Sequence, residues 1–267
     1  LEPEDDPEGM PDLAAIIAAR SDPNAFVEYV LSDIETGEPL RQAEIHRSWH
    51  AHIDGHSRAL ILAPREHGKT EQIVIGRVLW ELGRNPQLRV KIVCQDDGTA
   101  TKRLGAIQGH IERSERLHLV FPDLRPHPDL ADWSKHTATV ARQGEDKDPS
   151  IEAAGILSTG TGGRADLIVY DDVVALRNSI QQPALRELVK EAFRNVWSNL
   201  LTARGRAIYI ATPWHADDLT HDLERSPSWS VLRQVIGEDL APIWWERWSP
   251  ERLRERRDEI GSRAFSR

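Results

Sequence analysis

Gly68, Lys69 and Thr70 have the residue types and the order that binding a phosphate chain requires. A glycine lets the backbone approach the phosphates, a lysine supplies a point charge, and a threonine hydroxyl can bind magnesium. The three residues lie between an apolar, strand-like run at 58–62 and a helix-like run at 71–85, whose first amides add free donors. The sequence therefore predicts a phosphate-binding loop between a strand and a helix.

The predicted loop departs from the usual pattern GxxxxGK(S/T), because Ala63 stands where the pattern has its first glycine. A helix amino terminus with an incidental lysine is the alternative interpretation. The helix-like run has Ile73, Val74 and Val78 on one face with helical periodicity, so a strand, a loop and an amphipathic helix follow in order. This context favours nucleotide binding.

A second motif consists of Asp171 and Asp172, which follow the apolar run Leu167–Tyr170. A buried strand of a parallel sheet brings such carboxylates to the carboxyl edge, where ligands bind. In phosphate-loop enzymes the first acid holds the magnesium bound by the loop hydroxyl, and the second orients or deprotonates the attacking water. Adjacent aspartates also simply end strands. Their position about a hundred residues after the loop favours the catalytic interpretation.

Two further segments are expected near the phosphates. Arg164 ends the glycine-rich loop 160–164, which we expect at the phosphate edge, where it either presents an arginine to a neighbouring subunit's nucleotide or forms a surface turn. A third apolar run, 206–211, is followed by Thr212, a polar residue at the phosphate edge, from which a phosphate-loop enzyme can sense whether the γ-phosphate is present. For Asp217 and Asp218 we expect helix capping.

His46 and His50 are one helical turn apart, a spacing that can bind a metal ion. No cysteine or second cluster with ligand spacing accompanies them in the sequence, so we expect no zinc.

The composition limits the class of protein. The 267 residues suit one α/β domain, and no apolar run approaches the length of a membrane span. The single cysteine, Cys94, fits a reducing cytoplasm, and the amino terminus does not resemble a signal peptide. The net charge of −9 argues against wrapping nucleic acid over the whole surface but leaves room for a local basic patch.

Alternation of strand-like and helix-like runs predicts a mostly parallel sheet with helices on both faces, which is the α/β architecture of P-loop NTPases of the RecA-like type. We further expect a hairpin formed by residues 136–142 and 149–155, and a longest helix over residues 181–203.

Residues 63–70, 166–172 and 210–219 together resemble, in order and spacing, the ATPase domain of the large terminase subunit of tailed bacteriophages. That subunit is the motor that drives DNA into the capsid. The resemblance covers roughly residues 40–267, and residues 244–267 are similar to the stretch that leads to an RNase H-like nuclease in that family.

The resemblance implies a role for each matching residue of the loop and the acidic motif. Lys69 and Thr70 bind the phosphates and magnesium, and Arg65 contacts the γ-phosphate from within the loop. Asp171 is the metal-associated acid, and Asp172 stands where most members have a catalytic glutamate. Because aspartate is one methylene shorter, the water must lie closer or the catalytic role is shared.

The remaining implied roles concern ATP recognition and coupling. Glu66 and His67 complete the ATP-binding loop, and Thr212 couples hydrolysis to movement. His46 falls where many members have a glutamine that reads adenine, with Gln42 as the near alternative. Arg164 is offset from the glycine-loop arginine of some members, which weakens its assignment as a trans-acting finger.

As a function, the resemblance implies Mg²⁺-dependent ATP hydrolysis that works on double-stranded DNA. The expected partners are a homo-oligomeric ring, the portal protein and the small terminase subunit, in the host cytoplasm and without a membrane. We expect a helical appendage at 1–39, the ATPase core at 40–248 and the start of a linker at 249–267, without DNA cleavage. Two alternatives stay open: a superfamily-2 helicase-like ATPase, which needs a second core, and a nucleotide-gated binding module that does not hydrolyse ATP.

Overall fold

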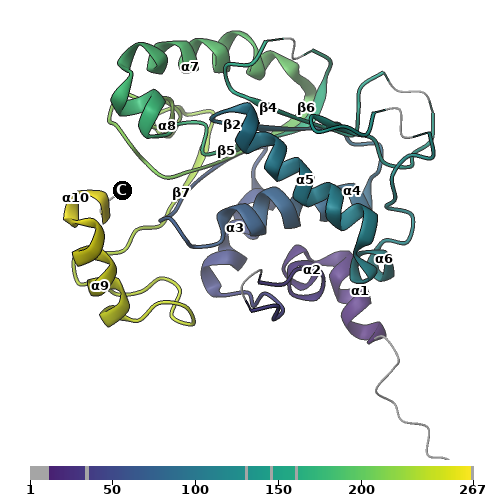
Figure 1. Cartoon of the computed structure of the whole chain (residues 1–267), viewed down its shortest axis with the longest axis horizontal. Coiled ribbons are helices and arrows are strands. Elements are labelled where there is room, and N and C mark those ends of the chain that lie inside the picture. Colours follow the sequence, from purple (N-terminus) through teal and green to yellow (C-terminus); the bar gives the residue numbers. More distant parts are fainter. Residues whose placement is uncertain (1–11, 34–35, 130–131, 145–146, 160–161, 266–267) are drawn as a thin grey trace, which may run out of the picture.

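A computed structural model of the chain describes residues 12–33, 36–129, 132–144, 147–159 and 162–265. In these residues a seven-stranded sheet runs in the order β3-β4-β2-β5-β6-β1-β7 (Figure 1). All neighbouring strands pair in parallel except β3, which pairs antiparallel with β4. The strands are β1 (Arg58–Leu62), β2 (Val90–Cys94), β3 (Thr137–Ala138), β4 (Ile151–Gly155), β5 (Ala165–Asp171), β6 (Leu201–Ala211) and β7 (Ser230–Arg233).

Helices cover both faces of the sheet because its central strands are apolar on both sides. On β1, Ala59 and Ile61 pack into one buried cluster, whereas Leu60 and Leu62 pack into another. The first face carries α1 (Leu13–Ser21), α2 (Pro23–Val30), α3 (Glu44–Gly55), the π-helix η2 (Thr70–Arg77), α4 (Val78–Arg84), α5 (Asp97–Arg113) and α6 (Glu115–Val120). The second face carries η3 (Arg177–Gln181), α7 (Pro183–Asn195), η4 (Trp197–Leu200) and α8 (Leu219–Glu224).

The chain after β7 leaves the two helical layers. It ends in α9 (Pro250–Ile260) and α10 (Ser262–Phe265), which lie beside the sheet in Figure 1. At the other end, Phe26 and Val27 of α2 are fully buried in the same cluster as the first face of the sheet. The division into segments 1–39, 40–248 and 249–267 stays a prediction.

The predicted P-loop architecture is confirmed, and so is the antiparallel pairing of the segments around β3 and β4. The predicted helix 181–203 is wrong at its carboxyl end, because α7 ends at Asn195 and β6 begins at Leu201. Trp197 lies at the break, as the first residue of η4, where it is buried and donates its indole N–H to the Ile156 carbonyl, 2.8 Å away. Among the described residues, α5 is the longest helix, and no helix is long and apolar enough to cross a membrane.

Candidate active site

Three of the predicted motifs meet at the carboxyl edge of the sheet. The loop follows β1, Thr212 follows β6, and Asp171 ends β5. Because β6 pairs with β1 on one side and with β5 on the other, these ends are neighbours. The sheet order therefore sets Thr212 between the loop and the acidic pair.

The loop is a tight turn that closes around the Lys69 side chain. Its ammonium donates to the carbonyls of Ala63 at 2.6 Å and Pro64 at 2.7 Å. Gly68 has a φ of 80°, a left-handed conformation that favours glycine. Burial lowers the pKa of Lys69, while the carboxylates of Asp172 and Asp171 act in the opposite direction. The predicted lysine is thus directed into the site.

A chain of polar contacts links the three strand ends. The Lys69 ammonium lies 3.3 Å from the Thr212 hydroxyl, and the Thr212 N–H donates to Oδ1 of Asp172 at 3.1 Å. The backbone N–H of Asp172 donates to the Ile210 carbonyl on β6 at 3.0 Å. Thr212 therefore contacts the loop through its hydroxyl and the candidate base, Asp172, through its backbone amide.

Backbone strain is concentrated in the same place. Among the described residues, the non-glycine residues with a positive φ are Glu66 (59°), Asp172 (44°) and Leu240 (57°). Two of these three lie in the loop and the acidic motif. Such conformations persist where surrounding contacts enforce them, and they cluster at functional sites.

Asp171 is fully buried beside Asp172. Its Oδ2 accepts from Nε of Arg103 on α5 at 2.8 Å, while its Oδ1 has no hydrogen-bond partner in the described part of the chain. Burial raises the pKa of Asp171 to about 6, an effect that Arg103 opposes and Asp172 reinforces. A carboxylate oxygen without a partner and the hydroxyl of Thr70, the first residue of η2, are hard oxygen donors of the kind that Mg²⁺ prefers. These residues fit a magnesium site.

Arg65 lies at the outer side of the loop. Its guanidinium carbon is 4.2 Å from the centre of the Trp214 ring, two residues beyond Thr212, in a cation–π contact. The arginine is exposed, so it is free to reorient around this contact.

Arg164 does not lie at the phosphate edge, so that part of the prediction is wrong. It precedes the first residue of β5, and its guanidinium donates to the Asn199 carbonyl at 3.2 Å. At about 3.3 Å per residue, the eight residue steps from Arg164 along β5 to Asp172 span roughly 26 Å. Its action on a neighbouring subunit stays a prediction. Residues 160 and 161 of the glycine-rich loop fall outside the described residues.

His46 holds the loop and has no ring nitrogen left to read a base. Its Nδ1 accepts from the Ala43 N–H at 3.2 Å, which makes Nε2 the protonated nitrogen that donates to the His67 carbonyl at 3.1 Å. Burial lowers the pKa of His46 to about 4, so the ring is neutral. This geometry argues against the predicted adenine-reading role.

Gln42 is the better placed alternative. Its amide nitrogen donates to the Gln72 side chain at 2.9 Å, and its Oε1 is buried with no partner in the described segments. A base amino group is a donor that such an oxygen accepts.

The side chains of Glu66 and His67 contact the chain after β7. The His67 ring stacks on Trp248 with centroids 5.8 Å apart and planes 13° apart. Glu66 forms an ion pair with Arg256 of α9 at 2.7 Å. Both side chains are thus directed toward the chain after β7, and the ATP-binding role of these two residues stays a prediction.

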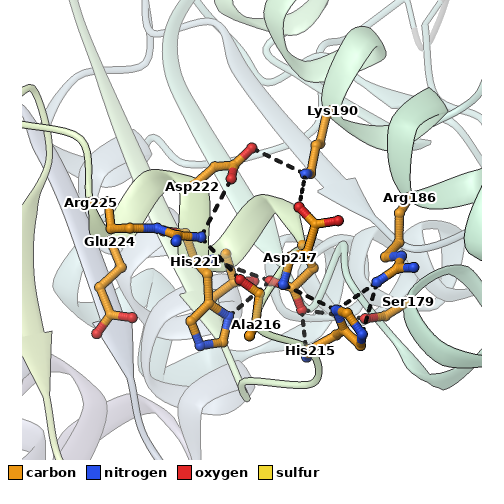
Figure 2. A network of polar contacts seen from close by, with 12 residues as sticks. Ser179, Arg186, Lys190, His215, Ala216, Asp217, His221, Asp222, Glu224 and Arg225 are labelled. Carbon is orange, nitrogen blue, oxygen red and sulfur yellow. Dashed lines mark hydrogen bonds and ion pairs between the residues drawn. The ribbon is translucent and has the colours of Figure 1, made fainter.

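The segment after Thr212 is tied to α7 by a polar network, drawn in Figure 2. Asp218 caps α8, as predicted, and accepts from the N–H groups of His221 at 3.1 Å and His215 at 2.9 Å. Asp217 does not cap the helix but pairs with Lys190 of α7 at 2.8 Å. The expectation of capping is therefore wrong for Asp217.

The chain is similar to known proteins in sequence and in fold. No family model matches the chain. The chain is 30% identical over 220 residues to the terminase large subunit of Enterobacteria phage T3, which covers 71% of this chain and 36% of that protein. The chain thus spans about a third of the length of this relative.

Two solved structures share the fold. The large terminase of bacteriophage HK97 superposes with a TM-score of 0.55 at 15% identity, covering 86% of this chain and 47% of that one. The large terminase ATPase domain of Thermus phage P74-26 gives a TM-score of 0.53 at 18% identity, covering 85% and 91%. The ATPase domain alone is matched over 91% of its length, so this chain has the fold of bacteriophage large terminase ATPase domains.

Proposed function

We propose that this chain binds and hydrolyses Mg²⁺-ATP as the ATPase unit of a motor that moves double-stranded DNA into a viral procapsid. The observation that carries the proposal is the contact chain from Lys69 through Thr212 to Asp172 at one edge of the sheet. The similarity to terminase large subunits supports the link to DNA packaging.

In the proposed reaction the loop binds the phosphates. The ammonium of Lys69 exchanges the carbonyls of Ala63 and Pro64 for phosphate oxygens, which bear more negative charge. The amides at the start of η2 add donors. Thr70 and Asp171 would hold Mg²⁺, whose charge neutralises that of the β- and γ-phosphates.

Asp172 is proposed to orient and deprotonate the attacking water. Its Oδ1 is fixed by the Thr212 N–H, and the carboxylate is only partly buried, which leaves Oδ2 for a water molecule. Arg65 is proposed to leave Trp214 and stabilise the charge that develops on the γ-phosphate. Thr212 contacts both Lys69 and Asp172. Loss of the γ-phosphate would therefore change the contacts of Thr212 at the end of β6.

Phosphate release from Mg²⁺-ATP tests this function, with and without double-stranded DNA. We expect turnover, and a rate per subunit that rises with protein concentration because an arginine from a neighbour in a homo-oligomeric ring completes the site. A flat rate per subunit would argue against this trans contribution. Arg164 is the proposed candidate for that arginine.

The same measurements separate the two alternatives. Tight ATP binding without phosphate release, even with DNA and a portal-bearing procapsid, would instead indicate a nucleotide-gated binding module. Strand separation by the isolated chain would indicate a helicase-like ATPase.

A further inference from the structure

A cavity of about 250 Å³ lies beside the loop, on the side where the chain after β7 returns. Gly68 of the loop and Gln72 of η2 form one side of it, Leu40 lies on the segment before α3, and Trp244 and Arg247 follow β7. The cavity therefore begins at Gly68, where the backbone would approach a phosphate chain bound by the loop. We propose that it takes the base of the bound nucleotide and that Trp244 and Arg247 hold that base.

The charges around the cavity suit a base and not the phosphates. Asp33, Glu66 and Glu71 line it together with Arg41 and Arg247, so the lining holds no surplus of positive charge. A triphosphate needs such a surplus, whereas a nucleobase is neutral. The phosphate end is accounted for by the loop, so the neutral end of the nucleotide falls in the cavity.

Trp244 and Arg247 are held together by their own turn. The N–H of Trp248 donates to the Trp244 carbonyl at 2.9 Å, and the Arg247 guanidinium carbon is 5.4 Å from the centre of the Trp244 ring. The Trp244 ring also contacts His46 edge to face, with centroids 4.6 Å apart, and the β-carbon of a residue at Gly68 would lie 3.9 Å from it. An indole and a guanidinium are the flat groups on which bases stack.

Arg247 also carries a donor without a partner. Its Nε is buried and makes no hydrogen bond to any described residue, although another nitrogen lies 3.8 Å from Asp33. A buried donor of this kind costs free energy until it is satisfied, and the ring nitrogens of a purine are acceptors. Gln72, which lines the cavity, accepts from the amide nitrogen of Gln42, whose buried Oε1 has no partner among the described residues.

This inference rests on the proposed function and adds a specificity role for the chain after β7. The same segment stacks Trp248 on His67 and pairs Arg256 with Glu66. Base binding would therefore join the loop and this segment through a third contact.

Two ligands separate the base from the phosphates: Mg²⁺-ADP and inorganic tripolyphosphate, each titrated calorimetrically into the intact chain. Trp244→Ala should weaken ADP binding roughly 10- to 100-fold, the range expected for loss of base stacking, and leave tripolyphosphate binding unchanged. Trp244→Phe keeps a ring and should stay within a few-fold of the parent. Trp245→Ala is the matched control, because Trp245 is 65% exposed and does not line the cavity.

Each result has one meaning. Parent-like ADP affinity of Trp244→Ala overturns the inference. An equal loss of affinity for ADP and tripolyphosphate overturns it as well, because Trp244 would then support the loop and not the base. Lys69→Ala should weaken both ligands. A parent chain that binds neither ligand would refute the proposed function, and this inference with it, whereas a parent that binds both leaves the proposed function standing whatever Trp244→Ala does.

Discussion

Replacing Asp172 by asparagine removes the charge of the proposed base and changes little else. The side-chain carbonyl of asparagine can still accept from the Thr212 N–H, the 3.1 Å contact that fixes the carboxylate. Asparagine also tolerates the left-handed backbone, with its φ of 44°, better than most residues do. We therefore expect the free energy of unfolding to change by less than about 1 kcal/mol.

The effect on catalysis should be far larger. A positioned general base contributes about 10²- to 10⁴-fold, so kcat for Asp172→Asn should fall by at least about 100-fold. Affinity for Mg²⁺-ADP should stay within a few-fold of the parent, because Lys69 and Thr70 are intact. Phosphate release under saturating ATP and calorimetric titration of ADP measure the two quantities separately.

Two further variants calibrate this result. In Asp172→Ala the Thr212 N–H has no side-chain acceptor, and alanine tolerates a positive φ less well than aspartate does. This variant should therefore also lower the free energy of unfolding, measured with denaturant, by about 1–3 kcal/mol. Asp123→Asn removes a charge from an exposed carboxylate away from the site and should behave as the parent. If Asp172→Asn retains more than a tenth of the parent kcat, Asp172 is not the base.

Two other perturbations probe the arginine and the metal site. Arg65→Ala should retain ADP affinity within a few-fold but lose kcat by about 10³-fold, the lower end of the range for a transition-state arginine; equal losses of affinity and kcat would make it a binding residue. The pKa of Asp171 is raised to about 6, so its carboxyl is ionised at pH 7 and largely protonated at pH 5. Mg²⁺-dependent ADP affinity should fall about tenfold between those pH values, and Asp171→Asn should remove the part of this pH dependence that Asp171 contributes. If Asp171→Asn keeps the whole pH dependence of ADP affinity, another group is responsible for that dependence.

The central strands were predictable because burial on both faces makes them continuous apolar runs. This holds for residues 58–62, 90–94 and 167–170. Asp171 and Thr212 lie at one edge because β5 ends at Asp171, β6 ends just before Thr212, and the two strands pair in parallel. Phosphate-loop chemistry is likewise local, since Gly68, Lys69 and Thr70 are consecutive.

What the sequence did not reveal depends on contacts between distant residues. Arg103 pairs with Asp171, 68 positions away, and no spacing rule connects a helix residue to a later strand end. His46 was assigned to the base because of its position along the chain, but its hydrogen bond to the His67 carbonyl, 21 residues on, gives it a different role. Sequence proximity to Asp171 suggested the phosphate edge for Arg164, whereas the length of β5 carries it to the opposite edge.

In the sequence, the aromatic run around Trp244 and Trp248 is recognisable only as part of the stretch that resembles a connection to a nuclease. Its contacts with the loop arise from the way the chain returns after β7, and neither periodicity nor composition encodes that return.

The most direct test of the central claim compares Mg²⁺-ATP hydrolysis by the parent chain and by Lys69→Ala. Lys102→Ala is the control, because Lys102 is an exposed lysine on α5. We expect phosphate release at the background rate for Lys69→Ala and at the parent rate for Lys102→Ala. Hydrolysis by Lys69→Ala at the parent rate would contradict the proposal that this loop binds and activates ATP.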